Sequence, residues 1–164
     1  MKRLLASCFG LGRLPLAPGT WGSLPPAIIF GLMCHFHLPS IMVLIVMAVL
    51  ALAGSIACVR LTPYIIVATG KADPREVVVD EVAGQAITFL TVALLVPLNP
   101  TTGQVWAITA GGFVLFRLFD ISKPCPVRRL EELPRGWGVL ADDIMAGVYA
   151  GIVSQIIIFV WIWS

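Results

Sequence analysis

Long apolar stretches without charged residues alternate with shorter polar connections along the chain. Residues 41–59 and 144–163 contain no Asp, Glu, Lys or Arg, and each reaches the roughly 20 residues that a helix needs to cross a hydrocarbon core. Residues 82–98 and 105–119 are shorter apolar stretches, and residues 21–38 are apolar but contain two prolines and two histidines. This pattern predicts an all-α, polytopic membrane helix bundle with four to five spans.

Basic residues fall into alternate connections between these stretches. The N-terminal segment and residues 60–80 and 120–142 contain every Lys and every Arg except Arg117, whereas residues 37–40 and 97–104 contain no Asp, Glu, Lys or Arg. Cytoplasmic loops of membrane proteins carry an excess of Lys and Arg, so we expect the charged loops on the cytoplasmic face of a bacterial inner membrane. No internal repeat or long linker interrupts the pattern, and residues 1–164 are expected to form a single domain.

Composition agrees with a membrane protein and excludes other classes. Apolar residues make up 59% of the chain and charged residues only 12%, about half of the charged share of a soluble domain. The net charge is +2 and no Lys/Arg stripe is interleaved with aromatic residues, so no nucleic-acid partner is expected. The four cysteines form no C-x-x-C pair, so neither a zinc site nor a redox motif is predicted.

Acidic residues cluster at the ends of the predicted helices, and two explanations are open for them. An acid in the first turn, as expected where residues 80–81 and 142–143 open a span, caps free backbone N–H groups. One acid per helix is enough for that purpose. If the helix ends meet, adjacent carboxylates repel one another unless a hard divalent cation neutralises them, and Mg²⁺ prefers such oxygen ligands. The sequence therefore predicts a Mg²⁺ site with the candidate ligands Asp80, Glu81, Asp120, Asp142 and Asp143.

Two basic residues accompany these acids in the segment FRLFDISKP, residues 116–124. Arg117 lies three positions before Asp120 and shares a helix face with it, so its guanidinium could hold a phosphate beside a metal-bound carboxylate. The alternative is a plain ion pair between Arg117 and Asp120, because intramembrane charges commonly pair. Lys123 is a second candidate phosphate ligand, or an anchor at the membrane interface.

The segment LPLAPGTWGS, residues 14–23, is rich in Gly, Pro and hydroxyl groups and precedes an apolar stretch. Thr20 or Ser23 could cap the helix that follows, and a helix start of this kind can cradle a phosphate. The segment has no Walker pattern. An ordinary turn with an N-cap is the simpler explanation, and both stay open.

With these residues in view, the chain resembles the phosphatidylglycerophosphatase A family of bacterial, Mg²⁺-dependent lipid phosphatases. The resemblance rests on four blocks in the family's order: residues 14–23, DEVAGQ at 80–85, FRLFDISKP at 116–124 and GVLADDIMAG at 138–147. It implies hydrolysis of phosphatidylglycerophosphate to phosphatidylglycerol at the cytoplasmic face of the bilayer. It also implies that the five acids named above are metal ligands or acid–base groups, without dividing these roles among them.

Metal-assisted attack of water on the phosphorus is the mechanism that these residues favour. Glu81, Asp142 and Asp80 are the candidate catalytic groups, with Glu81 or Asp142 accepting the proton of the water. The phosphate-binding candidates are Arg117, Lys123, Thr20 and Ser23. The alternative function is a small membrane transporter or channel with a carboxylate-lined ion site, and its weakness is that no acid lies in the middle of a predicted span.

Overall fold

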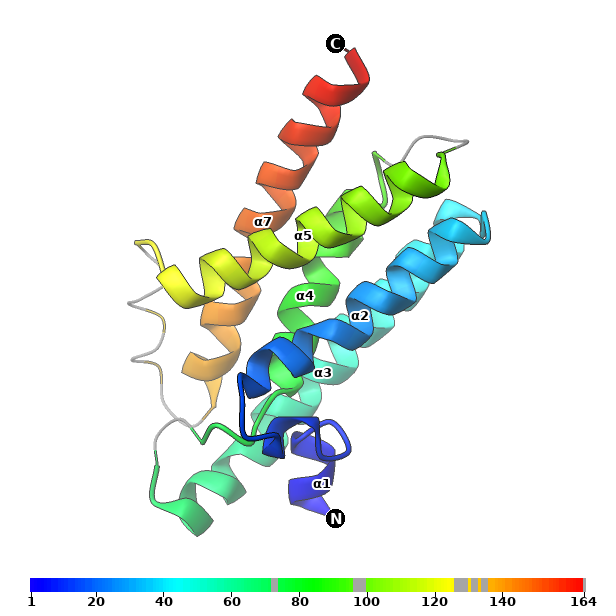
Figure 1. The fold of residues 1–164 in the computed structure, drawn as a ribbon. Coiled ribbons are helices and arrows are strands. Elements are labelled where there is room, and N and C mark those ends of the chain that lie inside the picture. The colour runs from blue at the N-terminus through cyan, green and yellow to red at the C-terminus, as the bar shows by residue number, and fades with distance from the viewer. Residues whose placement is uncertain (72–73, 96–99, 126–129, 131–132, 134–135, 164) are drawn as a thin grey trace.

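Every regular element of the protein is a helix within the part of the chain that the structure describes. The structure is a computed structural model, and it describes residues 1–71, 74–95, 100–125, 130, 133 and 136–163. The all-α prediction is confirmed. In chain order the elements are α1 (Lys2–Ala6), η1 (Leu11–Arg13), α2 (Pro18–His35), α3 (Ser40–Thr69), α4 (Val79–Val92), α5 (Thr102–Ser122) and α7 (Trp137–Trp163), as Figure 1 shows.

Three of these helices are long and apolar enough to cross a membrane, namely Ser40–Thr69 in α3, Thr102–Ser122 in α5 and Trp137–Trp161 in α7. The four to five predicted spans are therefore not confirmed. Helix α4 has only 14 residues, or about 21 Å at 1.5 Å per residue, which is less than the roughly 30 Å of a hydrocarbon core. The predicted span at residues 82–98 is too long, because the helix ends at Val92.

Helix α4 is the central helix and not a lipid-facing one. It packs against α7, α3 and α2, and ten of its 14 residues are buried. Its apolar residues contact protein, since Phe89 stacks on Phe30 of α2 with ring centroids 4.4 Å apart. The apolar composition that predicted a span at this position thus reflects a buried helix of the protein core.

Glycines allow α4 and α7 to approach each other closely. A Cβ atom on Gly84 of α4 would lie 2.5 Å from the carbonyl oxygen of Asp143, and one on Gly147 of α7 would collide with the backbone of Gly84. The hydroxyl of Thr88 donates to the carbonyl oxygen of Gly147 at 3.2 Å. Small residues and such hydrogen bonds are the usual means of close helix packing in membrane proteins. The contact sets the N-terminal turn of α4 beside residues 142–143 of α7.

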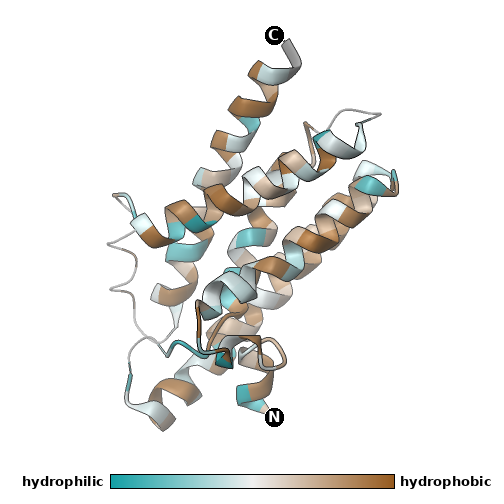
Figure 2. Ribbon diagram, in the orientation of Figure 1, coloured by the Kyte–Doolittle hydropathy of each residue, from teal (hydrophilic) through white to brown (hydrophobic). Residues whose placement is uncertain are grey.

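The helix ends are arranged so that polar residues collect at one end of the bundle. The α2–α3 turn, the end of α4 and the C-terminus lie at one end in Figure 1, and the starts of α2 and α4 and the end of α5 lie toward the other. Helix α5 ends because Lys123 adopts a left-handed conformation, with φ of 42°, and the residue before a proline disfavours the α conformation. Polar turns of α5 and α7 lie beside each other in Figure 2.

Candidate active site

Neither acidic pair occupies the N-cap position of its helix. The N-cap of α4 is Val78 and makes no side-chain cap hydrogen bond, although Asp80 and Glu81 lie in the first turn. The prediction that residues 142–143 open a helix is wrong, because α7 already begins at Trp137. The apolar residues 137–141 continue the helical pattern of α7 toward the N-terminus. N-capping therefore does not explain the acids of α7, whereas Asp80 and Glu81 lie in the first turn of α4, where the helix dipole favours a carboxylate.

Three of the five predicted acids meet at one point. Oxygen atoms of Asp80, Glu81 and Asp143 all lie within 4.8 Å of one another, and Asp80 and Asp143 are each only 4% exposed. Glu81 is in α4, which is not one of the three candidate spans. Burial raises the pKa of Glu81 to about 8; a hydrogen bond with Asp80 opposes this shift, and the charges of Asp143 and Asp120 add to it. The three carboxylates form a buried site that disfavours its own negative charge.

This cluster of three carboxylates suits a hard divalent cation. Two oxygens on opposite sides of one Mg²⁺ lie about 4.2 Å apart, because each Mg–O bond is about 2.1 Å. Neighbouring ligands of an octahedral ion lie only about 3.0 Å apart, so the carboxylates of Asp80, Glu81 and Asp143, which lie within 4.8 Å of one another, would move closer together on binding the ion. Oε2 of Glu81 is buried and has no hydrogen-bond partner among the described residues, so it is available to a ligand. Carboxylate oxygens are the donors that Mg²⁺ prefers.

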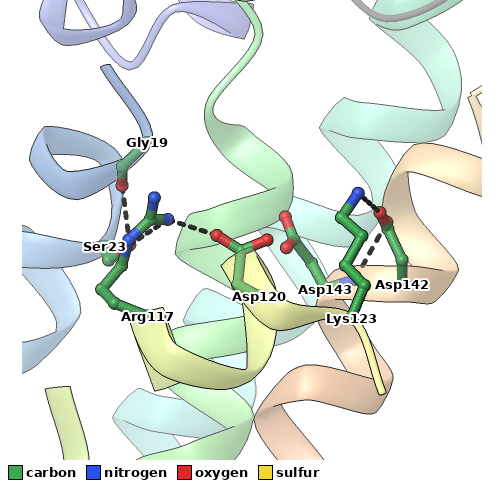
Figure 3. Close-up of polar contacts among 7 residues, drawn as sticks. All are labelled: Gly19, Ser23, Arg117, Asp120, Lys123, Asp142 and Asp143. Atoms are coloured by element: carbon green, nitrogen blue, oxygen red, sulfur yellow. Dashed lines mark hydrogen bonds and ion pairs between the residues drawn. The ribbon is translucent and has the colours of Figure 1, made fainter. Parts of the chain in front are cut away.

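The other two predicted acids are paired with the two basic residues among the four predicted phosphate ligands. Arg117 Nη1 lies 2.5 Å from Asp120 Oδ2, and Lys123 Nζ lies 2.6 Å from Asp142 Oδ2 (Figure 3). The plain ion pair between Arg117 and Asp120 that the sequence left open is thus present. The five acids are not equivalent, because three converge on one point and two neutralise cations beside them.

All of these groups share one pocket of about 580 Å³, which explains how the two sets act together. The five acids, Arg117 and Lys123 all line it, and Arg75 adds a further cation. The sequence analysis expected Arg75 on the cytoplasmic face, as part of the charged loop at residues 60–80, but did not name it as a residue of the site. Arg128, Arg129 and Arg135, which were expected on the same face, lie outside the described residues.

The start of α2 forms one wall of the pocket, although not in the way that was predicted. Its N-cap is Ala17, without a side-chain cap hydrogen bond, so the prediction that Thr20 or Ser23 caps this helix is wrong. The hydroxyl of Ser23 instead donates to the carbonyl oxygen of Gly19 at 2.7 Å, and Arg117 Nη1 donates to the same hydroxyl at 3.5 Å (Figure 3). Ser23 is therefore a buried support for Arg117, and Thr20 is not among the residues that line the pocket.

Gly19, which lines the pocket, and the buried Gln85 were not singled out from the sequence. Gly19 lines the pocket, and a Cβ atom there would collide with Oε1 of Glu81 and lie 2.9 Å from Arg117 Nη1. Gln85 lies one turn after Glu81, is fully buried, and neither polar atom of its side chain has a partner among the described residues. Glycine and proline in residues 14–23 signalled a close approach at Gly19, whereas nothing in the sequence signalled the burial of Gln85.

Known proteins resemble this chain over most of its length. A sequence model of phosphatidylglycerophosphatase A matches residues 4–158. The chain is 38% identical to phosphatidylglycerophosphatase A of Haemophilus influenzae, over 92% of this chain and 84% of that protein. It is 36% identical to phosphatidylglycerophosphatase A of Escherichia coli, over 88% of this chain and 76% of that protein. It is also 36% identical to a Bacteroides thetaiotaomicron protein named as a candidate phosphatidylinositol-3-phosphatase, over 93% and 91% of the two chains. No solved structure matches.

Proposed function

The chain belongs to the phosphatidylglycerophosphatase A family, and on this premise we propose that it hydrolyses the terminal phosphomonoester of phosphatidylglycerophosphate to phosphatidylglycerol and phosphate. The observation that carries the proposal is the convergence of Asp80, Glu81 and Asp143 within 4.8 Å in a pocket that also contains Arg117 and Lys123. Enzymes that cleave phosphate esters commonly combine carboxylates that bind a metal cation with positively charged side chains that bind the phosphate.

Arg117 and Lys123 supply the contacts to the phosphoryl group. Each is held by a carboxylate partner, which keeps the two cations in place inside the pocket when no substrate is bound. A phosphate can share such a cation with its carboxylate, because Arg presents several N–H donors and Lys three. Arg75 lines the same pocket and adds positive charge toward the solvent, since its side chain is on an exposed residue.

Asp80, Glu81 and Asp143 would hold Mg²⁺, and Asp120 and Asp142 stand beside them with their cations. When bound, the metal lowers the pKa of water and withdraws charge from the phosphoryl oxygens. The protein contributes the positions of the donors, which come from α4 and α7 and are fixed by the close packing of Gly84 against Gly147. A rigid arrangement of this kind costs little reorganisation during the reaction.

The chain's own groups account for the remaining chemistry. An attacking water forms the new P–O bond and gives a proton to a carboxylate, for which Glu81 and Asp142 are the candidates; Asp142 is engaged with Lys123, and Glu81 would serve through the oxygen that does not bind the metal. The P–O bond to glycerol breaks, and the glycerol oxygen takes up a proton as it leaves. Arg117 and Lys123 offset the charge that develops on the phosphoryl oxygens.

Phosphate release from purified protein tests this function. We expect phosphatidylglycerophosphate in detergent to release phosphate with Mg²⁺ and not with chelator, and Asp143→Asn to abolish the release. The relative named for phosphatidylinositol-3-phosphate makes that lipid the appropriate second substrate. If the protein hydrolysed only phosphatidylinositol-3-phosphate, the proposed phosphatase chemistry would stand, but phosphatidylglycerophosphate would no longer be the proposed substrate. No hydrolysis of either lipid would contradict the proposal.

We also propose that the pocket faces the cytoplasm of a bacterial inner membrane. The basic residues lie in the N-terminal segment and in the connections at residues 60–80 and 120–142, and loops rich in Lys and Arg are cytoplasmic. Lys71 and Thr102 are both exposed. Lys71 follows the end of α3 and Thr102 begins α5, and these two helix ends lie at opposite ends of the bundle in Figure 1. In a chain whose four cysteines are replaced by Ser, Lys71→Cys should be protected from an impermeant thiol reagent in intact cells, and Thr102→Cys should react. The reverse result would contradict the orientation.

A small transporter or channel is the second function that carboxylates in a membrane protein allow. The five acids lie together in one pocket at one end of the bundle, and the described residues at the opposite ends of α5 and α7 include no charged side chain. An ion path needs polar groups along its whole length. Flux of Mg²⁺ into liposomes containing the protein, without any phosphatase activity, would favour this second function.

A further inference from the structure

An apolar groove runs along the outer side of the contact between α5 and α7. It encloses about 200 Å³ and none of its lining residues is charged. Ile108, Gly111 and Leu115 line it from α5, and Ser154, Ile157 and Trp161 line it from α7. Gly111, Ile157 and Trp161 are exposed, so the groove is open toward the surrounding bilayer.

The groove begins close to the phosphate pocket and uses the same two helices. Leu115 precedes Asp120 by five residues, about 7.5 Å along α5, and Ala107 precedes it by thirteen, about 20 Å. On α5 the groove therefore lies roughly 7 to 20 Å from Asp120, and on α7 its residues follow Asp143 by 11 to 18 positions, about 16 to 27 Å. The groove thus reaches from the acyl region of one leaflet past the middle of a bilayer whose core is about 30 Å thick. A lipid with its phosphate at Arg117 and Asp120 would bring an acyl chain to this depth.

A second groove of similar size lies on the other side of α5. It also encloses about 200 Å³ and is lined by Leu24 and Ile28 of α2 and by Trp106, Ala110 and Phe113 of α5. Leu24 directly follows Ser23, the residue that contacts Arg117. Helix α5 thus has an apolar groove on each side, and both grooves begin near the polar pocket.

We propose that the two grooves hold the two acyl chains of the lipid substrate, one on each side of α5, while its phosphate occupies the polar pocket. The inference rests on the proposed lipid phosphatase function and adds the part of the substrate that lies in the membrane. A phosphatidyl lipid has one phosphorylated headgroup and two acyl chains, which matches one polar pocket flanked by two apolar grooves. Burial of acyl methylenes in the grooves would contribute substrate affinity.

Glycines of α5 provide a matched pair of variants for the first groove. A Cβ atom on Gly111 or on Gly103 would meet nothing within 4 Å, so a larger side chain can begin at either position without a clash of its Cβ. Gly111 lines the groove and Gly103 lines neither groove. Ala110→Leu serves the second groove, because Ala110 is exposed and lines it.

The assay compares kcat/KM for a dipalmitoyl and a dihexanoyl substrate in the same detergent. Gly111→Leu and Ala110→Leu should each lower the long-chain to short-chain ratio about tenfold, as expected when about two methylenes lose their apolar site. Gly103→Leu should leave the ratio as in the parent. An unchanged ratio in both groove variants would overturn the proposal. So would a dimer in the parent that becomes monomeric in Gly111→Leu with equal loss on both substrates, because a second copy would then fill the groove.

A binding measurement separates this inference from the proposed activity. Phosphatidylglycerol with a photoreactive diazirine in one acyl chain should label residues 107–115 and 154–161 more strongly than the exposed side of α3, which serves as the bulk-lipid control. This label would persist even if the parent hydrolysed neither lipid. Equal labelling of α3 and of the grooves would overturn the acyl-chain site.

Discussion

Replacing Asp143 with Asn removes one charge from the cluster of three carboxylates and preserves the shape of the side chain. Asp143 is 4% exposed, and its nearest oxygen lies within 4.8 Å of oxygens of Asp80 and Glu81. It lies inside α7 and not at its start, so the change removes no helix cap. The variant therefore reports on the charge of the cluster and on its capacity to hold a cation.

The magnitude follows from the spacing of the carboxylates. Two ionised carboxylates 4.8 Å apart repel by about 3.5 kcal/mol at an effective dielectric constant of 20. Without a divalent cation, Asp143→Asn should relieve up to this much repulsion and raise the melting temperature by several degrees. With the cation, the lost ligand should remove the stabilisation that Mg²⁺ adds to the parent. If the loss of this ligand removes several kcal/mol of transition-state stabilisation, kcat should fall about 100-fold or more.

The assay is a thermal melt of detergent-solubilised protein with chelator and with Mg²⁺, followed by phosphate release. Glu76→Gln is the matched control, because Glu76 is a carboxylate in ion pairs with Arg3 and Arg13 away from the cluster. This control should keep the parent's response to Mg²⁺ and lose at most about 1 kcal/mol. Asp143→Asn melting lower than the parent in chelator, with the parent's Mg²⁺ response retained, would refute the metal site.

Three further changes test the surroundings of the cluster. Arg117→Lys should lower kcat more than about tenfold with little change in melting temperature, because a point charge replaces the planar donor set; the parent's rate would instead assign Arg117 a structural role. Gly19→Ala should abolish phosphate release while the protein still folds, because its Cβ collides with the flexible carboxylate of Glu81, and Gly103→Ala, whose Cβ meets nothing, should be silent in the same assay. Gln85→Met should raise the free energy of unfolding by about 1–3 kcal/mol, and with it the melting temperature, because the buried amide has no partner among the described residues; a lower melting temperature would show that the amide is satisfied in the folded protein.

Local patterns in the sequence were enough to predict an all-helical protein with long apolar helices, although not the bounds of every helix. Helix α5 illustrates this, because the apolar residues 105–119 lie inside it, and the structure extends it to Thr102 after a capping box of Thr101 and Gln104. These signals act over a few residues, so they can be read without knowledge of the fold. The same holds for the resemblance to the phosphatidylglycerophosphatase A family, which rests on four short blocks and is confirmed over residues 4–158.

Hydropathy could not distinguish a lipid-facing helix from a buried one. Residues 82–98 predicted a span, yet α4 is a short helix enclosed by α2, α3 and α7. An apolar side chain gains the same favourable environment from protein as from acyl chains, so composition is alike in both cases. Helix starts were misjudged for a related reason: Trp137 and the residues after it are apolar but belong to α7, which displaces residues 142–143 from its first turn.

The sequence by itself determined that five carboxylates and two cations would gather at one end of a helical membrane protein, because charged side chains avoid the apolar part of the bilayer. Only the tertiary structure decided how they divide. Asp80, Glu81 and Asp143 converge because Gly84 and Gly147 let α4 and α7 nearly touch, while Asp120 and Asp142 face Arg117 and Lys123. Distances between residues far apart in the chain depend on how side-chain volumes fit between helices, and no local pattern of residues contains that information.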